Sequence, residues 1–209
     1  AEVAVVQLIL SDYIFSRDAV LKLRAGKPTI FVPYVYLQGF RRLERIASKG
    51  VDHYDGAEPI RAEIARVGAN KAALNYMRGD VPGDNLSRFM GSLDALRHRE
   101  AQGADVKIAD YIAETFRDRV PCYSINHPAP HVLFQMYNQV AKLLGFTPVP
   151  DTISHYDLGR ATLPAGNGGL TPYCVEALGL NYDAEPHWFP ATNKNAQDVA
   201  RQWQKAQST

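Results

Sequence analysis

Residues 120–146, VPCYSINHPAPHVLFQMYNQVAKLLGF, contain the change of hydrophobic pattern that decides the fold. Their first six residues are apolar and tolerate β structure, which predicts a strand over residues 120–125. From residue 132 onward, apolar side chains recur every three or four positions, which is typical of one face of an amphipathic helix. Gly145 suits the end of that helix. The stretch therefore predicts a strand that leads directly into a helix.

Asn126, His127 and Pro128 form the joint between the predicted strand and the predicted helix. Proline suits the first position of a helix, so His127 is expected at the N-cap or beside it. The positive end of the helix dipole favours a neutral imidazole, and a neutral imidazole can act as a general base. The alternative is purely structural: His127 caps the helix and Asn126 closes the turn before it.

Two further strands are predicted near the N-terminus. The apolar run over residues 3–10 predicts a buried strand in which Gln7 is the only polar residue. Residues 29–35 predict another strand, which Pro33 ends early or confines to a sheet edge. A helix between them suits a parallel pairing. We expect these two strands and residues 120–125 to be neighbours in one small, mainly parallel sheet.

Most of the remaining sequence is predicted to be helical. Asp84 or Asn85 can cap one helix, and Asp105 can cap the next. Residues 147–192 are rich in proline and glycine and predict an irregular segment that contains one short helix. The predicted helices span residues 18–25, 57–67, 69–78, 85–102, 106–119, 172–178 and 195–206. The expected fold is α/β and predominantly helical, with a small, mainly parallel sheet flanked by helices.

Length and charge limit the classes of protein to consider. With 209 residues, of which 46% are hydrophobic, a single domain over residues 1–209 is expected. The 23 basic and 22 acidic residues leave a net charge of +1, which gives no electrostatic basis for binding nucleic acid. No apolar run approaches the length of a membrane helix, and no signal peptide is visible. Because an apolar strand begins at residue 3, we expect an upstream strand to be missing from this sequence.

Cysteine and histidine spacing predicts no metal centre. Cys122 and Cys174 show no metal-ligand spacing, so two buried thiols in a reducing cytoplasm are expected. His127 and His131 are four residues apart, but two ligands do not make a metal site.

Polar residues follow the predicted strands at their carboxyl ends. Ser11, Asn126 and His127 occupy such positions. Tyr34, Tyr36 and Gln38 lie at or just after the end of the strand predicted over residues 29–35. Because the carboxyl ends of parallel strands gather at one edge of a sheet, we expect a ligand-binding cleft there. Gly39 permits a close approach of the backbone at this edge.

Four segments resemble, in the same order, the WcbI-type polysaccharide biosynthesis family of acetyltransferases. They are VVQLILSDY, PTIFVPYVYLQGF, LRHREAQGADVKIADYI and CYSINHPAPHVLFQMYNQVAKLLG, and together they cover roughly residues 3–146. The resemblance implies a mostly helical α/β fold with some likeness to SGNH-type acyl-processing enzymes. Family members carry a Gly-Asn-Cys-Gln signature on their first strand. This sequence lacks that motif, so neither Cys122 nor Cys174 inherits the role of its cysteine.

The resemblance implies a coenzyme A-dependent acyltransferase that acetylates a carbohydrate in capsular or surface polysaccharide biosynthesis. Its expected partners are acetyl-CoA and a sugar or polysaccharide acceptor. His127 would deprotonate the sugar hydroxyl, and Asn126 would orient the histidine or donate to the oxyanion. The residues expected to bind coenzyme A are Gln7, Ser11, Tyr36, Gln38, Gly39, Arg97 and Arg99.

Two other functions fit the same residues. One is an SGNH-like esterase or deacetylase with Ser11 as its nucleophile, although Ser11 lacks the glycine-flanked context of a tight nucleophile turn. The other is a non-catalytic sugar- or nucleotide-binding module in which His127 is only a cap. Stabilisation by coenzyme A would separate the acyltransferase from both alternatives, and ester hydrolysis without coenzyme A would indicate the esterase.

Overall fold

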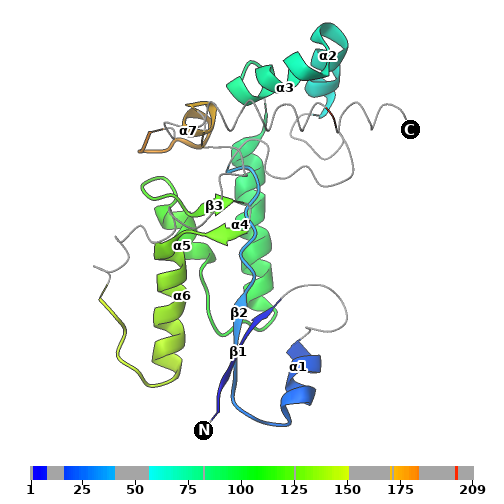
Figure 1. Cartoon of the computed structure of the whole chain (residues 1–209). Helices are drawn as coiled ribbons and strands as arrows, with labels where there is room; N and C mark the ends of the chain where they lie inside the picture. The colour runs from blue at the N-terminus through cyan, green and yellow to red at the C-terminus, as the bar shows by residue number, and fades with distance from the viewer. Residues whose placement is uncertain are drawn as a thin grey trace. The chain divides into compact units, whose positions relative to one another are not determined.

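The structure, a computed structural model, describes residues 2–8, 17–40, 57–81, 83–124, 126–150, 170, 172–183 and 201. Within these residues it contains seven helices and four strands, which confirms the mixed α/β class with helices in the majority (Figure 1). Contacts divide the chain into two compact units. The first unit comprises Ala1–Tyr36, Gly91–Phe116 and Val120–Thr162, and the second comprises Leu37–Met90, Arg117–Arg119 and Leu163–Thr209.

The helices agree closely with the sequence pattern. They are α1 (Arg17–Arg24), α2 (Ala57–Val67), α3 (Ala69–Arg78), α4 (Asn85–Ala101), α5 (Ala109–Thr115), α6 (Pro130–Leu143) and α7 (Pro172–Leu178). Glycine separates α2 from α3 and ends α3, where Gly79 adopts a left-handed conformation with φ of 90°. No helix in the described ranges has the length and apolar character needed to cross a bilayer. Apart from residue 201, the predicted helix over residues 195–206 lies outside these ranges.

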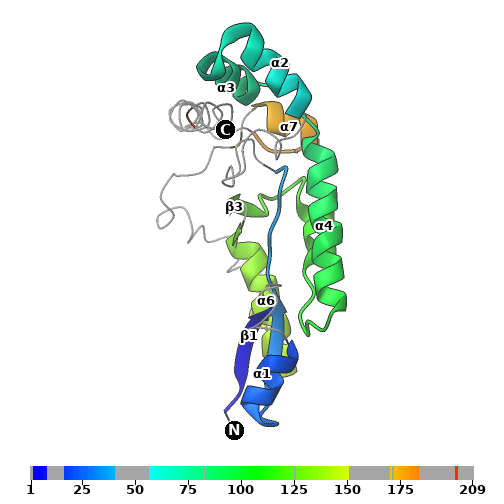
Figure 2. The same ribbon diagram turned by 90° about the vertical axis from the view of Figure 1, so that its right-hand side faces the viewer.

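The first unit contains a parallel pair of strands, β1 (Ala4–Leu8) and β2 (Thr29–Pro33). Val6 lies opposite Phe31 in the register and packs on a small core of Val20, Phe31 and Ala104. Helix α1 connects the two strands and contacts β2 (Figures 1 and 2). The parallel crossover and the early end of β2 at Pro33 were both predicted, and both are confirmed.

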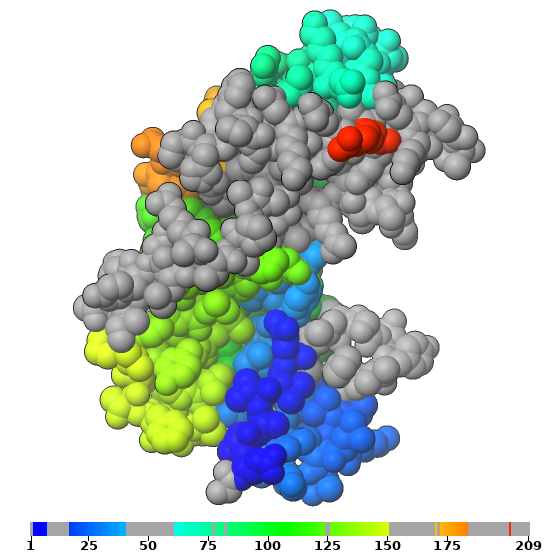
Figure 3. Space-filling model, viewed as in Figure 1, coloured from blue at the N-terminus to red at the C-terminus, as the bar shows by residue number. Residues whose placement is uncertain are grey.

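One face of β1 is open to solvent, so the prediction of a buried strand is wrong. Val5 is 53% exposed and Gln7 is also exposed. Side chains alternate between the two faces of a strand, and here the small core covers only the face that carries Val6. The strand forms part of the molecular surface, as the dark blue residues in Figure 3 show.

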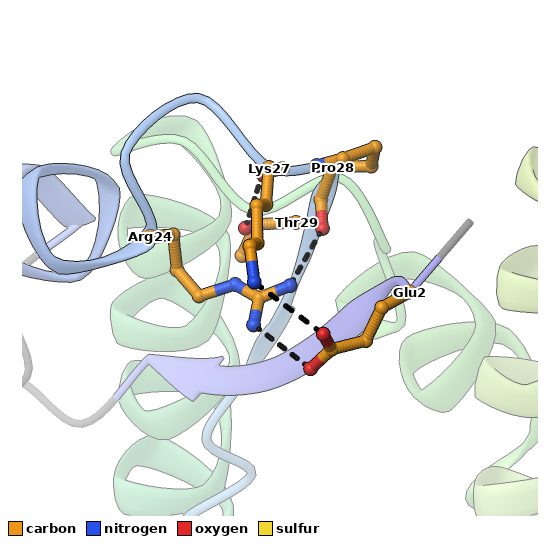
Figure 4. Close-up of polar contacts among 5 residues, drawn as sticks. All are labelled: Glu2, Arg24, Lys27, Pro28 and Thr29. Carbon is orange, nitrogen blue, oxygen red and sulfur yellow. Dashed lines mark hydrogen bonds and ion pairs between the residues drawn. The ribbon is translucent and has the colours of Figure 1, made fainter.

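Charged side chains tie the beginning of β1 to the connection between α1 and β2 (Figure 4). The Glu2 carboxylate lies 3.4 Å from Arg24 Nη1 and 3.5 Å from Lys27 Nζ. Arg24 Nη2 also donates to the carbonyl of Pro28, and Thr29 Oγ1 donates to the carbonyl of Lys27. Ion pairs this exposed contribute roughly 0–1 kcal/mol each, so they help to fix the register more than the stability.

The strand predicted over residues 120–125 belongs to a different sheet from β1 and β2, so the prediction of one three-stranded sheet is wrong. Strand β3 (Cys122–Ser124) pairs antiparallel with β4 (His127–Pro128), and the described strands form two separate two-stranded sheets. The Ala129 amide extends the pairing by donating to the Pro121 carbonyl at 2.8 Å. Because the chain reverses at Asn126, the two short strands meet with a very small loop-closure entropy. Local pairing therefore replaces the distant parallel pairing.

The second unit contains α2, α3, α7 and the first residues of α4. Gly39 lies against the beginning of α4 with φ of 79°, and a Cβ atom there would collide with the backbone of Asn85 and Phe89. The Asn85 side chain donates to the Gly39 carbonyl at 2.8 Å. The close backbone approach predicted at Gly39 is therefore confirmed, and its partner is the helix α4.

Helix α7 is joined to the residues that follow α3. The hydroxyl of Tyr173 accepts from the Gly83 amide at 3.1 Å and donates to the carbonyl of the same residue at 3.2 Å. The ring of Tyr173 fills the space beside Gly79, where a side chain would collide with it. Cys174 of α7 and Cys122 of β3 are both buried thiols, as predicted.

Candidate functional site

His127 and Asn126 lie on the β3–β4 hairpin of the first unit, immediately before α6. The N-cap of α6 is Ala129, with φ of −67° and ψ of 158°, and Pro130 occupies the first helical turn. The prediction that His127 caps this helix is therefore wrong. The reason is the second proline: a residue before proline avoids helical angles, so Pro130 keeps Ala129 extended and delays the helix. His127 lies in β4 with an exposed side chain.

Asn126 joins the hairpin to the segment that follows β2. Its Nδ2 donates to the hydroxyl of Tyr34 at 3.1 Å. Tyr34 in turn stacks with Tyr36, with ring centroids 6.0 Å apart and an angle of 29° between the ring planes. Both tyrosines are half-buried. The structure thus places Asn126 beside Tyr34, which stacks with the predicted cofactor residue Tyr36.

Arg99, near the end of α4, contributes a charge to this region. Its Nε and Nη2 atoms are buried, and within the described part of the chain neither has a hydrogen-bond acceptor. Burial lowers the pKa of Arg99, while the charges of Glu100 and Tyr34 act in the opposite direction. Tyr34 is thus one of the groups that act electrostatically on Arg99. We call Arg99, Tyr34 and Asn126 the Arg99 cluster.

Arg97, two residues earlier on α4, has a different environment. Its Nε donates to Asp110 at 2.8 Å and its Nη1 donates to Asp94 at 2.8 Å. Hydrogen bonds to Asp110 and then to Asp94 raise the pKa of Arg97. The Arg97 guanidinium group is thus engaged by two carboxylates at the surface. Arg97 and Arg99, which were both predicted to bind coenzyme A, therefore have different environments.

The connection between α4 and α5 contains two carboxylates with structural roles, and we call it the helix junction (Glu100 to Ala109). Glu100 is buried, and its Oε1 accepts from the amides of Ile108 and Ala109 at 2.6 and 2.9 Å. Asp105 accepts from the Phe31 amide at 2.8 Å and donates its own amide to the Phe31 carbonyl at 2.8 Å.

The predicted capping role of Asp105 is therefore wrong, because Glu100 satisfies the first amides of α5. The helix also begins later than predicted, at Ala109. A capping rule based on the residues just before a helix cannot find a cap supplied from the previous helix, eight residues away.

His131 is a buried polar residue for which sequence analysis found no role. Its Nδ1 lies 3.0 Å from the hydroxyl of Tyr111 in α5, and its Nε2 lies 2.8 Å from the carbonyl of Val120. A carbonyl can only accept, so Nε2 carries hydrogen and Nδ1 accepts from Tyr111 in a neutral imidazole. Through these two contacts His131 links its own helix, α6, to α5 and to Val120, which precedes β3. No three His, Cys, Asp or Glu residues in the described ranges are grouped as metal ligands would be.

The other predicted cofactor residues are more dispersed. Gln7 lies on the exposed face of β1 opposite Val32. Gln38 and Gly39 belong to the second unit, where the side-chain Oε1 of Gln38 accepts from Arg88 Nη2 at 3.1 Å. Ser11 lies outside the described residues.

Comparison with known proteins identifies the family. The sequence profile of WcbI, described as the polysaccharide biosynthesis enzyme WcbI, matches residues 1–149. No protein with a curated description matches the chain. One solved structure of similar fold is the polysaccharide biosynthesis enzyme WcbI, described as the native protein without a disulfide bond between coenzyme A and one of its cysteines. It is 14% identical, with a TM-score of 0.61 over 99% of this chain and 77% of that one. Because the profile covers well over half of its length, the chain belongs to the WcbI family of polysaccharide biosynthesis enzymes.

Proposed function

We propose that this protein is a coenzyme A-dependent acetyltransferase that modifies a hydroxyl group of a carbohydrate in capsular or surface polysaccharide biosynthesis. Membership of the family supports polysaccharide biosynthesis as the process. The coenzyme A named with the WcbI structure supports this compound as the acyl carrier. The observation that carries the proposal is the Arg99 cluster, which places polar hydrogen-bond donors around Tyr34 next to the hairpin that bears His127.

In the proposed reaction His127 acts as the general base. Its exposed position in β4 allows a sugar hydroxyl to approach from solvent. The imidazole takes the hydroxyl proton while the sugar oxygen attacks the thioester carbonyl carbon of acetyl-CoA. The carbon–sulfur bond then breaks, and the thiolate leaves and takes up the proton. Direct transfer of this kind needs no nucleophile from the enzyme.

Asn126 is proposed to assist at the same step. Its side-chain amide is fixed by donation to Tyr34, and its position next to His127 lets it orient the acceptor or donate to the developing oxyanion. Among the proposed cofactor residues, Tyr36 and Arg99 have the strongest structural support. Tyr36 stacks on Tyr34, and Arg99 has two buried nitrogens without an acceptor among the described residues. Gln7, Ser11, Gln38, Gly39 and Arg97 remain further candidates.

Thermal unfolding of the full-length natural protein in the presence of coenzyme A tests the proposal. A ligand that binds only the native state stabilises it by RT ln(1 + [L]/Kd), about 2.7 kcal/mol at one hundred times Kd. The melting temperature should therefore rise with coenzyme A concentration. No rise up to millimolar coenzyme A would contradict the proposal.

A transfer assay then separates the proposed reaction from hydrolysis. Acetyl-CoA labelled in the acetyl group should yield a labelled sugar and little acetate. Release of acetate from acetylated sugars without coenzyme A would instead identify an SGNH-like esterase or deacetylase. Binding of a sugar or nucleotide with neither reaction would indicate a non-catalytic module.

A further inference from the structure

Two nitrogens of the Arg99 guanidinium group lack, among the described residues, the hydrogen-bond acceptors that a buried arginine normally has. Its Nε and Nη2 atoms are buried, and within the described residues neither donates to an acceptor. The adjacent carboxylate of Glu100 does not supply one, because its Oε1 accepts from the amides of Ile108 and Ala109. Buried donors without partners are rare and cost stability, so their retention needs a reason.

The hydroxyl of Tyr34 offers a third donor in the same place. It accepts a hydrogen bond from Asn126 Nδ2, and in the described part of the chain its own hydrogen has no acceptor. Tyr34 lies near enough to Arg99 to influence it electrostatically. Asn126 is thus a positioning residue: it holds the phenol oxygen so that the hydrogen remains available to a ligand.

We propose that the Nε–H and Nη2–H groups of Arg99 and the O–H group of Tyr34 together bind an oxyanion of the substrates, a phosphate or a carboxylate group. The Nε and Nη2 atoms form one edge of the guanidinium group, and two parallel N–H bonds from this edge match two oxygens of either anion. The tyrosine hydroxyl can donate a third bond. Hydrogen bonds from a charged donor to an anion are stronger than those to a neutral acceptor, which favours an anionic ligand.

This inference rests on the proposed function, which supplies two sources of such an anion. One source is a phosphate group of coenzyme A. The other is the carboxylate of an acidic sugar acceptor. Both present the same chemistry to Arg99, and binding measurements with separate fragments distinguish them.

The test compares Arg99→Gln with Arg24→Gln by calorimetric titration of the full-length protein. Arg24 is the matched control because it has the same charge in the same unit and is already engaged by Glu2 and by the carbonyl of Pro28. The probes are coenzyme A, ADP and pantetheine, which separate phosphate from the neutral arm, and glucuronate and glucose, which differ in one carboxylate. Tyr34→Phe removes the third donor alone.

Arg99→Gln should weaken binding of the relevant anion about 10- to 100-fold, because hydrogen bonds to charged groups are among the strong ones. Tyr34→Phe should weaken it about 2- to 10-fold, and Arg24→Gln should change it by less than about twofold. Pantetheine and glucose should bind all variants alike. A loss confined to coenzyme A and ADP assigns the phosphate source, and a loss confined to glucuronate assigns the acidic acceptor.

Equal affinities of the Arg99→Gln and Arg24→Gln variants for every anion would overturn the inference, and so would the absence of anion binding by the unsubstituted protein. If Arg99→Gln does not fold, Tyr34→Phe decides, and unchanged anion affinity in that variant overturns the inference. The result is separable from the proposed function. If coenzyme A binds and neither coenzyme A nor glucuronate responds to the substitutions at Arg99 and Tyr34, the acetyltransferase is retained and the anion site is removed. Glucuronate binding that depends on Arg99, without coenzyme A binding, does the reverse.

Discussion

The helix junction begins at the residue that follows Arg99, but the buried polar groups of the helix junction and of the Arg99 cluster differ in whether their hydrogen bonds are complete. At the helix junction, Glu100 accepts from two amides of α5, and Asp105 exchanges two hydrogen bonds with Phe31. In the Arg99 cluster, two buried nitrogens of Arg99 have no acceptor among the described residues. Arg99 and Glu100 are consecutive residues, yet the carboxylate has its partners in place and the two guanidinium nitrogens have none among the described residues.

The difference shows which polar groups serve the fold and which serve a ligand. Folding favours buried groups whose hydrogen bonds are complete, because an incomplete one costs free energy without compensation. Glu100 is thus explained by the structure of the protein alone. The buried donors of Arg99 have no acceptor among the described residues, and we infer that a ligand supplies it. Substitutions at the helix junction should therefore lower stability, whereas substitutions at or beside the Arg99 cluster should mainly change activity.

The largest expected effect is on catalysis, at the hairpin next to the Arg99 cluster. His127→Asn should lower acetyl transfer about 100- to 10,000-fold, the usual contribution of a general base. Because the side chain is exposed and does not cap α6, the free energy of unfolding should change by less than about 1 kcal/mol. Acetyl transfer kinetics and urea unfolding measure the two quantities.

His98→Asn is the matched control for this substitution, since His98 is an exposed histidine on α4 of the same unit. It should keep near-normal transfer. If His127→Asn also keeps near-normal transfer, the assignment of the general base is wrong. Coenzyme A affinity should persist in both variants, because the imidazole is assigned to the acceptor hydroxyl.

The next effect is on stability, at the helix junction. Glu100→Ala leaves the buried amides of Ile108 and Ala109 without their acceptor, and the free energy of unfolding should fall by about 1–3 kcal/mol. Glu114→Ala is the control, because Glu114 is an exposed residue of the same helix α5. Urea unfolding compares the two variants. Equal losses would show that the cap of α5 contributes nothing specific.

A smaller effect on the free energy of unfolding is expected from substitutions on α4, with opposite signs for Arg97 and Arg99. Arg99→Met should leave the free energy of unfolding unchanged or raise it by up to about 1 kcal/mol, since it removes buried donors that lack acceptors. Arg97→Met should lower it by about 0.2–1 kcal/mol through loss of the surface ion pairs. A fall of more than about 1 kcal/mol for Arg99→Met would show that the guanidinium group stabilises the fold.

The smallest effect concerns acid stability in the second unit, where Glu63 is another carboxylate with its partners in place. Hydrogen bonds from Arg66 and then Asn75 lower the pKa of Glu63 from 4.5 to about 2. Since the folded pKa is the lower one, the ionised group stabilises the fold above pH 4.5, and this contribution disappears as the pH falls towards 2. Glu63→Gln should therefore unfold with a weaker pH dependence between these values.

Unfolding midpoints in urea at several pH values from 2 to 5 check this expectation. Glu176→Gln supplies the control, because Glu176 is an exposed carboxylate on α7 of the same unit. An identical pH dependence in the two variants would contradict the role given to Glu63.

Local pattern alone was sufficient for most of the helices and for the parallel pair of strands, but not for the extent of α5 or the start of α6. The bounds of α2, α3 and α7 follow from apolar spacing and from glycine at Gly68 and Gly79, and the end of β2 follows from Pro33. The family resemblance likewise rested on sequence, in the order of four segments. These features depend on a few neighbouring residues, so the sequence by itself determined them.

The tertiary structure decided the features that depend on distant partners. Residues 120–125 were expected beside β1, but β3 pairs with β4, because Pro130 delays the helix and lets the chain reverse at Asn126. Arg97 and Arg99 look equivalent in the sequence, and only folding gives one of them two carboxylates and leaves buried donors of the other without acceptors among the described residues. Hydrogen-bond completion and burial are properties of the packed chain, and for this reason the sequence could name residues of the candidate site but not their hydrogen bonding.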